Sequence, residues 1–374
     1  MNPRIGELRD ELARLCDAIG RRVQFMEVCG THTVSAFRSG LRSMVPANLR
    51  LISGPGCPVC VTSQRHIDAA IELASRKDVV IATYGDMVRV PGRWGSLELQ
   101  RAEGASVRVV NSARVALQIA REQPEKDVVF LGVGFETTAP ATAATVEEAR
   151  RTETKNFSVL MCHKQVVPAM MALLQAGDVP IDGFLCPGHV SVIIGASAYR
   201  PVVEQHNRGC VVAGFEPAQM LDGLVHLASQ VESGRPALEN VYRAVVSNEG
   251  NRAAQDLLAR VFVTAAASWR SIGTIPDSGF ELAPEYGGFD AVERFGLTLG
   301  EDEDNPECRC GEVIQGKVEP TACPLFGNAC TPLSPVGPCM ISSEGTCAAW
   351  YKYGYNRGAG RCAAAAPLPE IADR

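Results

Sequence analysis

Two cysteines with a two-residue spacing provide the first candidate chemistry in the chain. Cys57 and Cys60 lie in the run Gly-Pro-Gly-Cys-Pro-Val-Cys at 54–60, after a short apolar stretch. Two glycines around a proline allow a sharp turn that would face both sulfurs outward, ahead of a helical pattern over 63–76. The N-terminus of a helix favours the thiolate and lowers the thiol pKa. The motif predicts a redox dithiol or a metal-binding pair, with two packed loop cysteines as the alternative.

Six further cysteines lie close together near the C-terminal end of the chain. They fall within forty residues, between prolines and glycines, and little apolar sequence there could build a core: Cys308, Cys310, Cys323, Cys330, Cys339 and Cys347. Such a segment needs cross-links to hold a shape. Zinc prefers closely spaced cysteine pairs, whereas long irregular loops suit an iron–sulfur cluster. We expect a cluster, and zinc or loose thiols and disulfides are the alternatives.

A third motif places a single cysteine near a histidine in Cys-Gly-Thr-His-Thr at 29–33. Gly30 would let the backbone approach a ligand closely, and the thiolate of Cys29 is a soft metal ligand. His32 could ligate, donate a hydrogen bond or carry a proton. The hydroxyls of Thr31 and Thr33 could support the bound group. The alternatives are a buried structural cysteine and a satisfied surface histidine.

Glu136 lies in a fourth motif, Gly-Phe-Glu-Thr-Thr-Ala-Pro at 134–140. Its carboxylate could accept protons, although Thr-Ala-Pro is also an ordinary helix start. His189, after Pro-Gly, and Cys-His-Lys at 162–164 are weaker candidates. Cys16 and Cys210 are expected only to pack in the core.

The elements that position these motifs follow a regular alternation. Short apolar runs, each ending in a polar or glycine-rich motif, predict strands at 23–28, 49–53, 79–83, 107–110, 128–133, 158–161, 181–185 and 210–213. Helical patterns lie between them at 63–76, 112–122, 140–151, 166–176, 191–206 and 217–232. Strands that alternate with helices form parallel sheets, and such sheets bind ligands at the carboxyl ends of their strands. The motifs fall at those ends.

We expect an α/β fold with two parallel-sheet domains and an irregular C-terminal domain. A charged segment at 121–127 divides the strands into two groups of four, which gives a first α/β domain at 1–122 and a second at 123–235. The remainder, 236–374, would contain a helical connector, with helices at 240–246 and 253–269. A Gly/Pro-rich stretch, an acidic patch at 301–304 and the cysteine-rich domain would follow.

Composition excludes several functional classes. The net charge of −6 provides no basic field for nucleic acid, and no run approaches the length of a membrane span. The pattern over 4–22 is that of an amphipathic surface helix and not of a signal peptide, so we expect a cytoplasmic protein. Fourteen cysteines in a reducing compartment favour metal or redox chemistry over a disulfide scaffold.

Taken together and in order, these motifs resemble the HypD family of hydrogenase maturation proteins. The resemblance includes Pro-Gly-His-Val-Ser at 187–191 and, in the tail, Cys-Arg-Cys-Gly at 308–311, Cys-Pro-Leu-Phe at 323–326 and Ser-Ser-Glu-Gly-Thr-Cys at 342–347. It extends from about residue 22 to 355. The last twenty residues are Ala/Pro-rich, and their Cys362 matches nothing in the family pattern.

The resemblance implies a scaffold on which the Fe(CN)2(CO) unit of [NiFe]-hydrogenases is assembled. Family members have two α/β domains and a C-terminal [4Fe-4S] domain, similar in its surroundings to ferredoxin:thioredoxin reductase. They work with the small chaperone HypC and receive cyanide-derived ligands from HypE. The resemblance leaves open whether the chain is itself an enzyme.

The resemblance also implies roles for individual residues. Cys29 would hold the iron of the Fe(CN)2(CO) unit at the mouth between the two α/β domains, and Cys57 and Cys60 would exchange electrons with it or with the cluster. Six cysteines compete for four positions on the cluster. Cys308 and Cys310 are such close neighbours that both need not be ligands, which favours Cys308, Cys323, Cys330 and Cys347.

A second functional class uses the same cysteines but carries no Fe(CN)2(CO) unit. A stand-alone iron–sulfur thiol/disulfide oxidoreductase would need only the cluster and the dithiol. A plain disulfide reductase has no need of a third reactive thiol beside a histidine, so the motif at 29–33 favours the scaffold. A zinc-stabilised binding module is a third reading, distinguished by the absence of iron–sulfur absorption.

Overall fold

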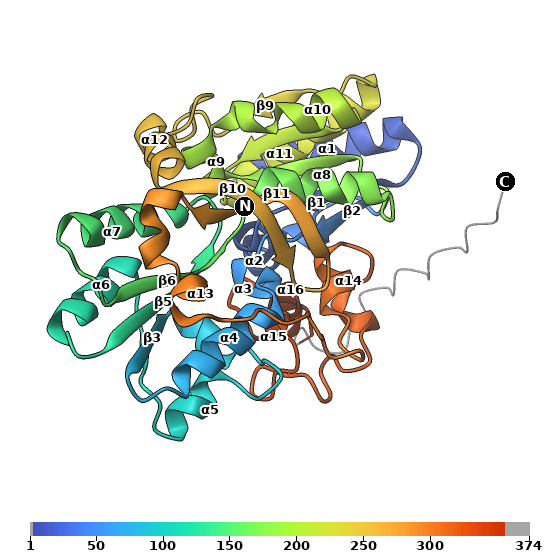
Figure 1. Ribbon diagram of the computed structural model, residues 1–374. Helices are drawn as coiled ribbons and strands as arrows, with labels where there is room; N and C mark the ends of the chain where they lie inside the picture. Colours follow the sequence, from blue (N-terminus) through green and yellow to red (C-terminus); the bar gives the residue numbers. More distant parts are fainter. Residues whose placement is uncertain (1–2, 356–374) are drawn as a thin grey trace.

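The structure is a computed structural model that describes residues 3–355 (Figure 1). Cys362 and the Ala/Pro-rich end lie outside the described residues. Two parallel sheets form the centre of the molecule, which confirms the expected α/β class. All eight strands predicted from the sequence are present, and several match the predicted runs to within a residue.

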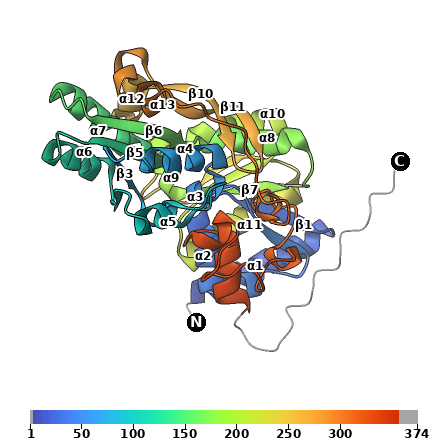
Figure 2. The ribbon, with the colours of Figure 1, turned by 60° about the horizontal axis from the view of Figure 1, so that its bottom comes forward.

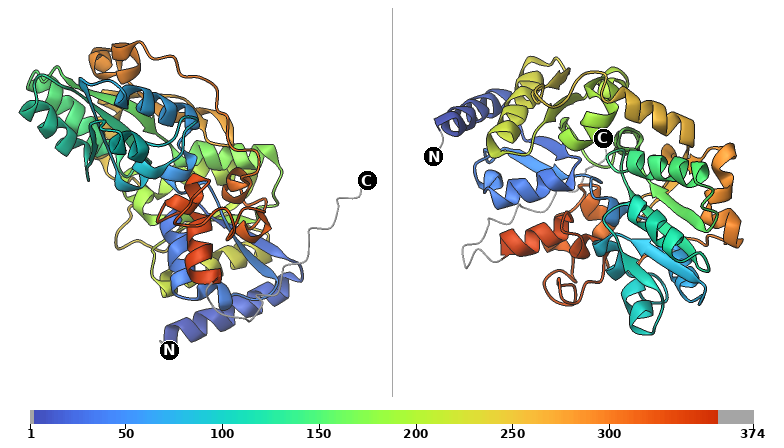
Figure 3. Two further views of the ribbon diagram at one scale, coloured as in Figure 1. Left: turned by 90° about the horizontal axis from the view of Figure 1, so that it is seen from below. Right: turned by 90° about the vertical axis from the view of Figure 1, so that its left-hand side faces the viewer.

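The first sheet has five parallel strands in the order β2-β1-β7-β8-β9. Its strands are β1 (Val23–Glu27), β2 (Leu49–Ser53), β7 (Gly183–Pro187), β8 (Gly209–Ala213) and β9 (Leu238–Asn240). On one face, apolar side chains of β1, β2, β7 and β8 pack against α1 (Pro3–Ile19) and α11 (Pro217–Ser233). Figure 3 shows these two helices side by side at one end of the molecule.

The second sheet has four parallel strands in the order β4-β3-β5-β6. Its strands are β3 (Val79–Thr83), β4 (Val107–Val109), β5 (Asp127–Gly134) and β6 (Phe157–His163). One face is covered by α6 (Ala113–Glu122), α7 (Ala139–Arg151) and the end of α12 (Arg252–Val261). The other face contacts α4 (Gln64–Ala74) and shares one continuous core with the first sheet, including α8 (Val166–Ala176) and α10 (Arg200–His206).

The sheets do not follow consecutive halves of the chain, and the expected assignment of four strands to each half is wrong. The chain forms β1 and β2, leaves to build the whole second sheet, and returns to add β7, β8 and β9. The predicted boundary at residues 122 and 123 therefore lies inside the second sheet, between α6 and β5. Every strand–helix unit has the same pattern, so the pattern does not reveal which strands pair.

The expected helical connector is also wrong in part. The helix predicted over 253–269 ends at Val261, and β10 (Phe262–Trp269) follows directly and pairs antiparallel with β11 (Gly273–Leu282). Residues 240–246 form the end of β9 and a turn rather than a helix. An alanine-rich apolar segment fits a helix and a strand equally well by periodicity, and the pairing with β11 decides the outcome here.

The acidic patch at 301–304 fastens the start of the C-terminal region to the rest of the molecule. Asp302 accepts hydrogen bonds from the backbone N–H of Arg65 (2.9 Å) and from the hydroxyl of Ser268 (2.5 Å). Asp304 accepts one from Nε of the buried Arg270 (2.7 Å). A buried guanidinium is costly without a partner, so these acidic residues anchor the segment.

Short helical turns make up the cysteine-rich region that follows. They are α14 (Cys310–Ile314), α15 (Pro338–Ile341), α16 (Thr346–Ala349) and a final turn at Trp350–Tyr355. This region packs against α2 (Gly30–Arg38) and the one-turn helix α3 (Pro58–Val61), as Figure 2 shows. The remaining helices are α5 (Leu97–Ala102), α9 (Gly188–Ile194) and α13 (Ala291–Phe295). Within residues 3–355, no helix has both the length and the apolar composition that crossing a membrane requires.

Candidate functional site

A cavity of about 680 Å³ lies where the strands of both sheets end. Its walls come from the segments that follow β1, β2, β3, β5 and β7, and from Glu344 of the cysteine-rich region. Most of the lining is apolar, with Val28, Val59, Phe135 and Val190 among its residues. Parallel sheets bind ligands at these strand ends, so the cavity is the candidate functional site.

Cys29 occupies the wall of this cavity at the N-cap position of α2. Its side chain is buried, and burial together with the nearby Glu344 carboxylate raises the thiol pKa to about 11. The thiol is therefore protonated at neutral pH. Thr31 also lines the cavity, and its hydroxyl donates to Oε1 of Glu344 at 2.8 Å.

Close backbone packing holds the Cys57 loop against Cys29. A side chain at Gly56 would overlap the backbone of Val28 and Cys29, and the Gly56 carbonyl accepts the N–H of Gly30 at 3.3 Å. Only glycine allows this approach. The two cysteine motifs, expected from the sequence at separate strand ends, are thus brought together at one wall.

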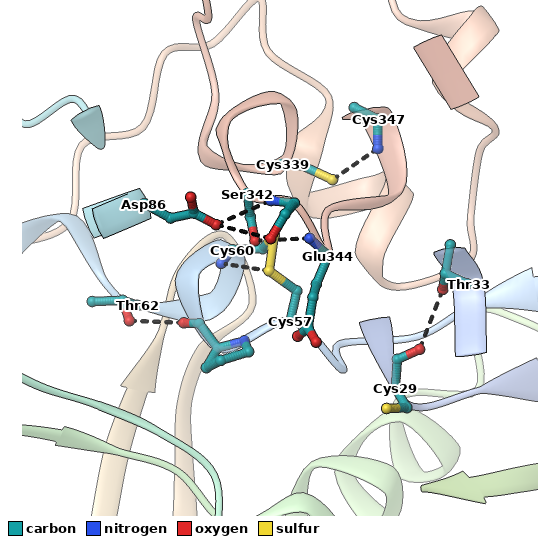
Figure 4. Close-up of a disulfide and its surroundings, with 12 residues drawn as sticks. Cys29, Thr33, Cys57, Cys60, Thr62, Asp86, Cys339, Ser342, Glu344 and Cys347 are labelled. Atoms are coloured by element: carbon teal, nitrogen blue, oxygen red, sulfur yellow. Dashed lines mark hydrogen bonds between the residues drawn. A yellow bond between two sulfur atoms is a disulfide. The ribbon is translucent and has the colours of Figure 1, made fainter. Parts of the chain in front are cut away.

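Cys57 and Cys60 form a disulfide beneath this wall (Figure 4). Cys57 caps α3, and its sulfur accepts the backbone N–H of Cys60 at 3.2 Å. Both residues are buried, so the expectation that their sulfurs face outward is wrong. The reason is packing from distant segments: α15 contacts α3, and Arg270 after β10 donates its N–H to the carbonyl of Val61.

A turn of the cysteine-rich region closes over the cavity wall. Ser343 donates its backbone N–H to Oδ2 of Asp86 (3.0 Å), and Glu344 extends beside Cys57 on the side of Cys29 in Figure 4. A side chain at Gly30 would meet Glu344 at 2.6 Å, which shows how closely the turn approaches α2. Sequence reasoning missed Glu344 and Asp86 as site residues. The only signal for Glu344 was its place in the motif at 342–347.

Two of the predicted site residues point away from the cavity. The Nε2–H of buried His32 donates to the carbonyl of Gly214 (3.0 Å), and burial lowers its pKa to about 4. The hydroxyl of Thr33 donates to the carbonyl of Cys29 (3.4 Å) inside α2. Neither residue lines the cavity, whereas His189, a weaker candidate from the sequence, does.

Glu136 lies between two cavity-lining residues, Phe135 and Thr137, but its own side chain is buried elsewhere. Oε1 accepts the backbone N–H of Val166 at 3.0 Å, and Oε2 has no hydrogen-bond partner among residues 3–355. Burial raises the pKa of this carboxyl to about 7. Glu136 therefore changes charge near neutral pH.

The six cysteines between residues 308 and 347 surround one small cavity, together with Leu325, Phe326, Gly337 and Met340. The Cys339 sulfur accepts the backbone N–H of Cys347 at 3.2 Å. The neighbouring Cys339 thiol and burial together raise the pKa of Cys310. In the described part of the chain, no three His, Cys, Asp or Glu side chains are placed to hold a single metal ion.

The fold and the site define a thiol-rich α/β protein with a single cavity thiol beside a disulfide. A family model described as "HypD: Hydrogenase formation hypA family" matches residues 4–354. The hydrogenase maturation factor HypD of Escherichia coli is 45% identical over 350 residues, covering 93% of this chain and 94% of that protein. The HypD of Azotobacter vinelandii is 45% identical over 347 residues, 91% of each chain. The chain belongs to the HypD family of hydrogenase maturation factors, as the motifs predicted.

Replacing Glu136 with glutamine tests the buried carboxyl. The pKa rises from 4.5 to about 7 on folding, so between these values the unfolded chain releases a proton that the folded chain keeps. Stability is therefore full below pH 4.5 and falls as the pH rises through 7, by up to about 3 kcal/mol. A glutamine at this position keeps a side-chain oxygen that can accept the backbone N–H of Val166, but it has no carboxyl group to titrate.

We expect the Tm of Glu136→Gln, relative to the wild type, to increase between pH 5 and pH 8. Thermal unfolding followed by circular dichroism measures this difference, with the exposed Glu125→Gln as control. A Tm difference that does not change with pH would contradict the raised pKa.

Proposed function

We propose that the chain is a cytoplasmic scaffold on which the Fe(CN)2(CO) unit of [NiFe]-hydrogenases is assembled. A HypC-type small chaperone would share the cargo, and a HypE-type protein would supply the cyanide. The observation that carries this proposal is the single thiol of Cys29, which lies in the wall of a large cavity and next to a buried disulfide.

Cys29 would hold the iron as a thiolate. A soft thiolate suits iron that carries cyanide and carbon monoxide. The cavity lining is mostly apolar, although it also contains the carboxylates of Asp86 and Glu344. The thiol must lose its proton when the iron binds. The positive charge of a bound metal would favour the thiolate and so lower the pKa that burial and Glu344 raise. The carboxylate of Glu344, whose negative charge contributes to the raised pKa of Cys29, would accept that proton.

Cys57 and Cys60 would act as a two-electron couple. Their disulfide takes up two electrons and two protons to become two thiols, and the reverse step returns them. Their position between the Cys29 wall and α15 supports an exchange with the cavity and with the cysteine-rich region.

The cysteine-rich region fits a [4Fe-4S] cluster by its donor set. The small cavity is lined by six soft thiol donors and apolar residues, with no carboxylate or imidazole among them. A cubane takes its four thiolates on separate irons, so the absence of a site for one ion in residues 3–355 does not conflict with it. We propose Cys308, Cys323, Cys330 and Cys347 as ligands, because Cys308 and Cys310 are such close neighbours in sequence that both need not be ligands. When bound, the cluster would supply one-electron redox chemistry.

The stand-alone oxidoreductase is the second candidate, favoured by the contact between α15 and the disulfide-bearing helix α3. It requires the cluster and the dithiol but gives no role to Cys29 or to its cavity. Infrared spectroscopy separates the two functions, because only the scaffold carries cyanide and carbon monoxide.

The first prediction concerns Cys29. A Cys29→Ala protein, isolated anaerobically with HypC, should retain its iron–sulfur absorbance and show no cyanide or carbon monoxide stretches. The physical reason is that the cluster thiols surround a separate cavity. Cys16→Ala, a buried cysteine of α1, is the matched control and should keep the stretches. Normal stretches in Cys29→Ala would place the cargo on another residue.

The second prediction concerns the dithiol. Cys60→Ala should reduce hydrogenase maturation to background while cluster iron and sulfide stay at the wild-type level. A three-residue separation closes only a short loop, so little stability should be lost with the disulfide. Maturation is measured as hydrogenase activity in a complemented deletion strain. Undiminished activity would exclude a redox role for this pair.

The third prediction concerns the choice of cluster ligands. Cys308→Ser should lower bound iron and acid-labile sulfide by more than half, whereas Cys310→Ser should leave both near the wild-type level. The two positions are neighbours in sequence, so each variant is the control for the other. The opposite outcome would mean that the ligand assignment is wrong.

A further inference from the structure

The tip of the β10–β11 hairpin lies between the helix that carries the disulfide and the cysteine-rich region. On one side, Arg270 donates its backbone N–H to the carbonyl of Val61 in α3 at 3.0 Å. On the other side, a side chain at Gly311 of α14 would lie 2.2 Å from Cβ of Ser271, and Gln315 donates to the carbonyl of Ser271 at 3.2 Å. One turn of the chain therefore contacts both α3 and α14.

The backbone of this tip is fixed from several directions. Nε1–H of the buried Trp269 donates to the hydroxyl of Ser278 at 2.7 Å, inside the hairpin. Ser271 has a φ of 59°, a left-handed conformation that a non-glycine residue keeps only where its surroundings hold it. Its hydroxyl donates to Oδ2 of Asp304 at 2.5 Å. Arg270, between Trp269 and Ser271, is therefore held at one position.

The guanidinium of Arg270 is a buried positive charge with one carboxylate partner. The residue is 5% exposed, and its Nε–H donates to Oδ1 of Asp304 at 2.7 Å. Its other contacts are neutral acceptors, the carbonyl of Pro91 (3.3 Å) and Oε1 of Gln64 (3.5 Å). Apolar residues often stabilise a protein as well as a buried ion pair does. Stability alone therefore does not account for an arginine at this position.

The positive charge of Arg270 acts on the cysteine-rich region. Cys310 begins α14 directly before Gly311, and it lines the small cavity that the six cysteines surround. The Cys339 thiol and burial raise the pKa of Cys310, and the charge of Arg270 opposes this rise. A cation in such a poorly solvated place stabilises negative charge more strongly than it would in water.

From this geometry we infer that Arg270 raises the reduction potential of the cluster, because its buried charge stabilises the electron that the cluster gains. This inference rests on the proposed function. The potential of an iron–sulfur cluster depends on the charges, hydrogen bonds and solvent around it. One-electron reduction adds one negative charge, which Arg270 stabilises and Asp304 opposes. Removal of the two charges, one at a time, should therefore shift the potential in opposite directions.

The test is an anaerobic redox titration of the full-length protein with dithionite, followed by visible absorbance and electron paramagnetic resonance. We expect the midpoint potential to become more negative in Arg270→Gln, to stay closer to the wild-type value in Arg270→Lys, and to become more positive in Asp304→Asn. Arg93→Gln is the matched control. It removes an arginine that pairs at the surface with Glu303 of the same acidic patch, at 3.0 Å, and the potential should not change because exposed charges are screened.

Thermal unfolding and iron content of each variant show whether a shift comes from loss of the fold or of the cluster. Unchanged potentials in Arg270→Gln and Asp304→Asn, with wild-type iron content, would overturn the role of Arg270 while leaving the scaffold function intact. If Arg270→Gln does not fold, an unchanged potential in Asp304→Asn would overturn it equally. A wild-type protein without iron–sulfur absorbance would instead contradict the cluster of the proposed function, and this inference with it.

Discussion

The close packing of Gly56 on the backbone of Cys29 is the constraint on which the site depends. A single added methyl group there would overlap the peptide that carries the cavity thiol. This contact fixes the loop after β2 against the loop after β1, so the disulfide of that loop lies directly behind Cys29. The neighbouring glycine at 30 allows Glu344 to approach from the other side. Three segments far apart in sequence therefore meet at one point because two glycines leave room for them.

The path of the chain explains why the cavity joins both sheets. After β2 the chain leaves the first sheet, builds the second, and returns to place β7 beside β1. The loops after β3 and β5 consequently face those after β1 and β7. The C-terminal turn adds the last wall through the bond between Ser343 and Asp86. Glu344, which contacts the Cys29 motif through Thr31, lies in the turn between Cys339 and Cys347. This turn therefore connects the small cavity lined by the C-terminal cysteines to the cavity that contains Cys29.

Local patterns in the sequence were enough to predict the eight parallel strands and most helices, because apolar runs and glycine motifs mark each strand and its end. Strand order was not predictable, since repeated strand–helix units look alike whichever sheet they join. The segment after Val261 was ambiguous for a different reason: its alanines fit a helix until β11 pairs with it. At the site, the identity of Cys29 and of the disulfide pair was predictable from residue type and spacing. The orientation of His32, the burial of the disulfide and the approach of Glu344 all depend on contacts between distant segments.

The electrostatics of the site keep the Cys29 thiol protonated. Burial and the negative charge of Glu344 both oppose ionisation of Cys29. Thiol–disulfide exchange and oxidation require the thiolate, so a protonated Cys29 does not attack the nearby disulfide of Cys57 and Cys60. In the proposed scaffold function, a metal cation would reverse this balance, because it would stabilise the thiolate and would itself be attracted by the same carboxylate. The negative charge of Glu344 would then suppress thiol–disulfide exchange by the free thiol and favour metal binding, which would explain why a carboxylate is tolerated beside a buried cysteine.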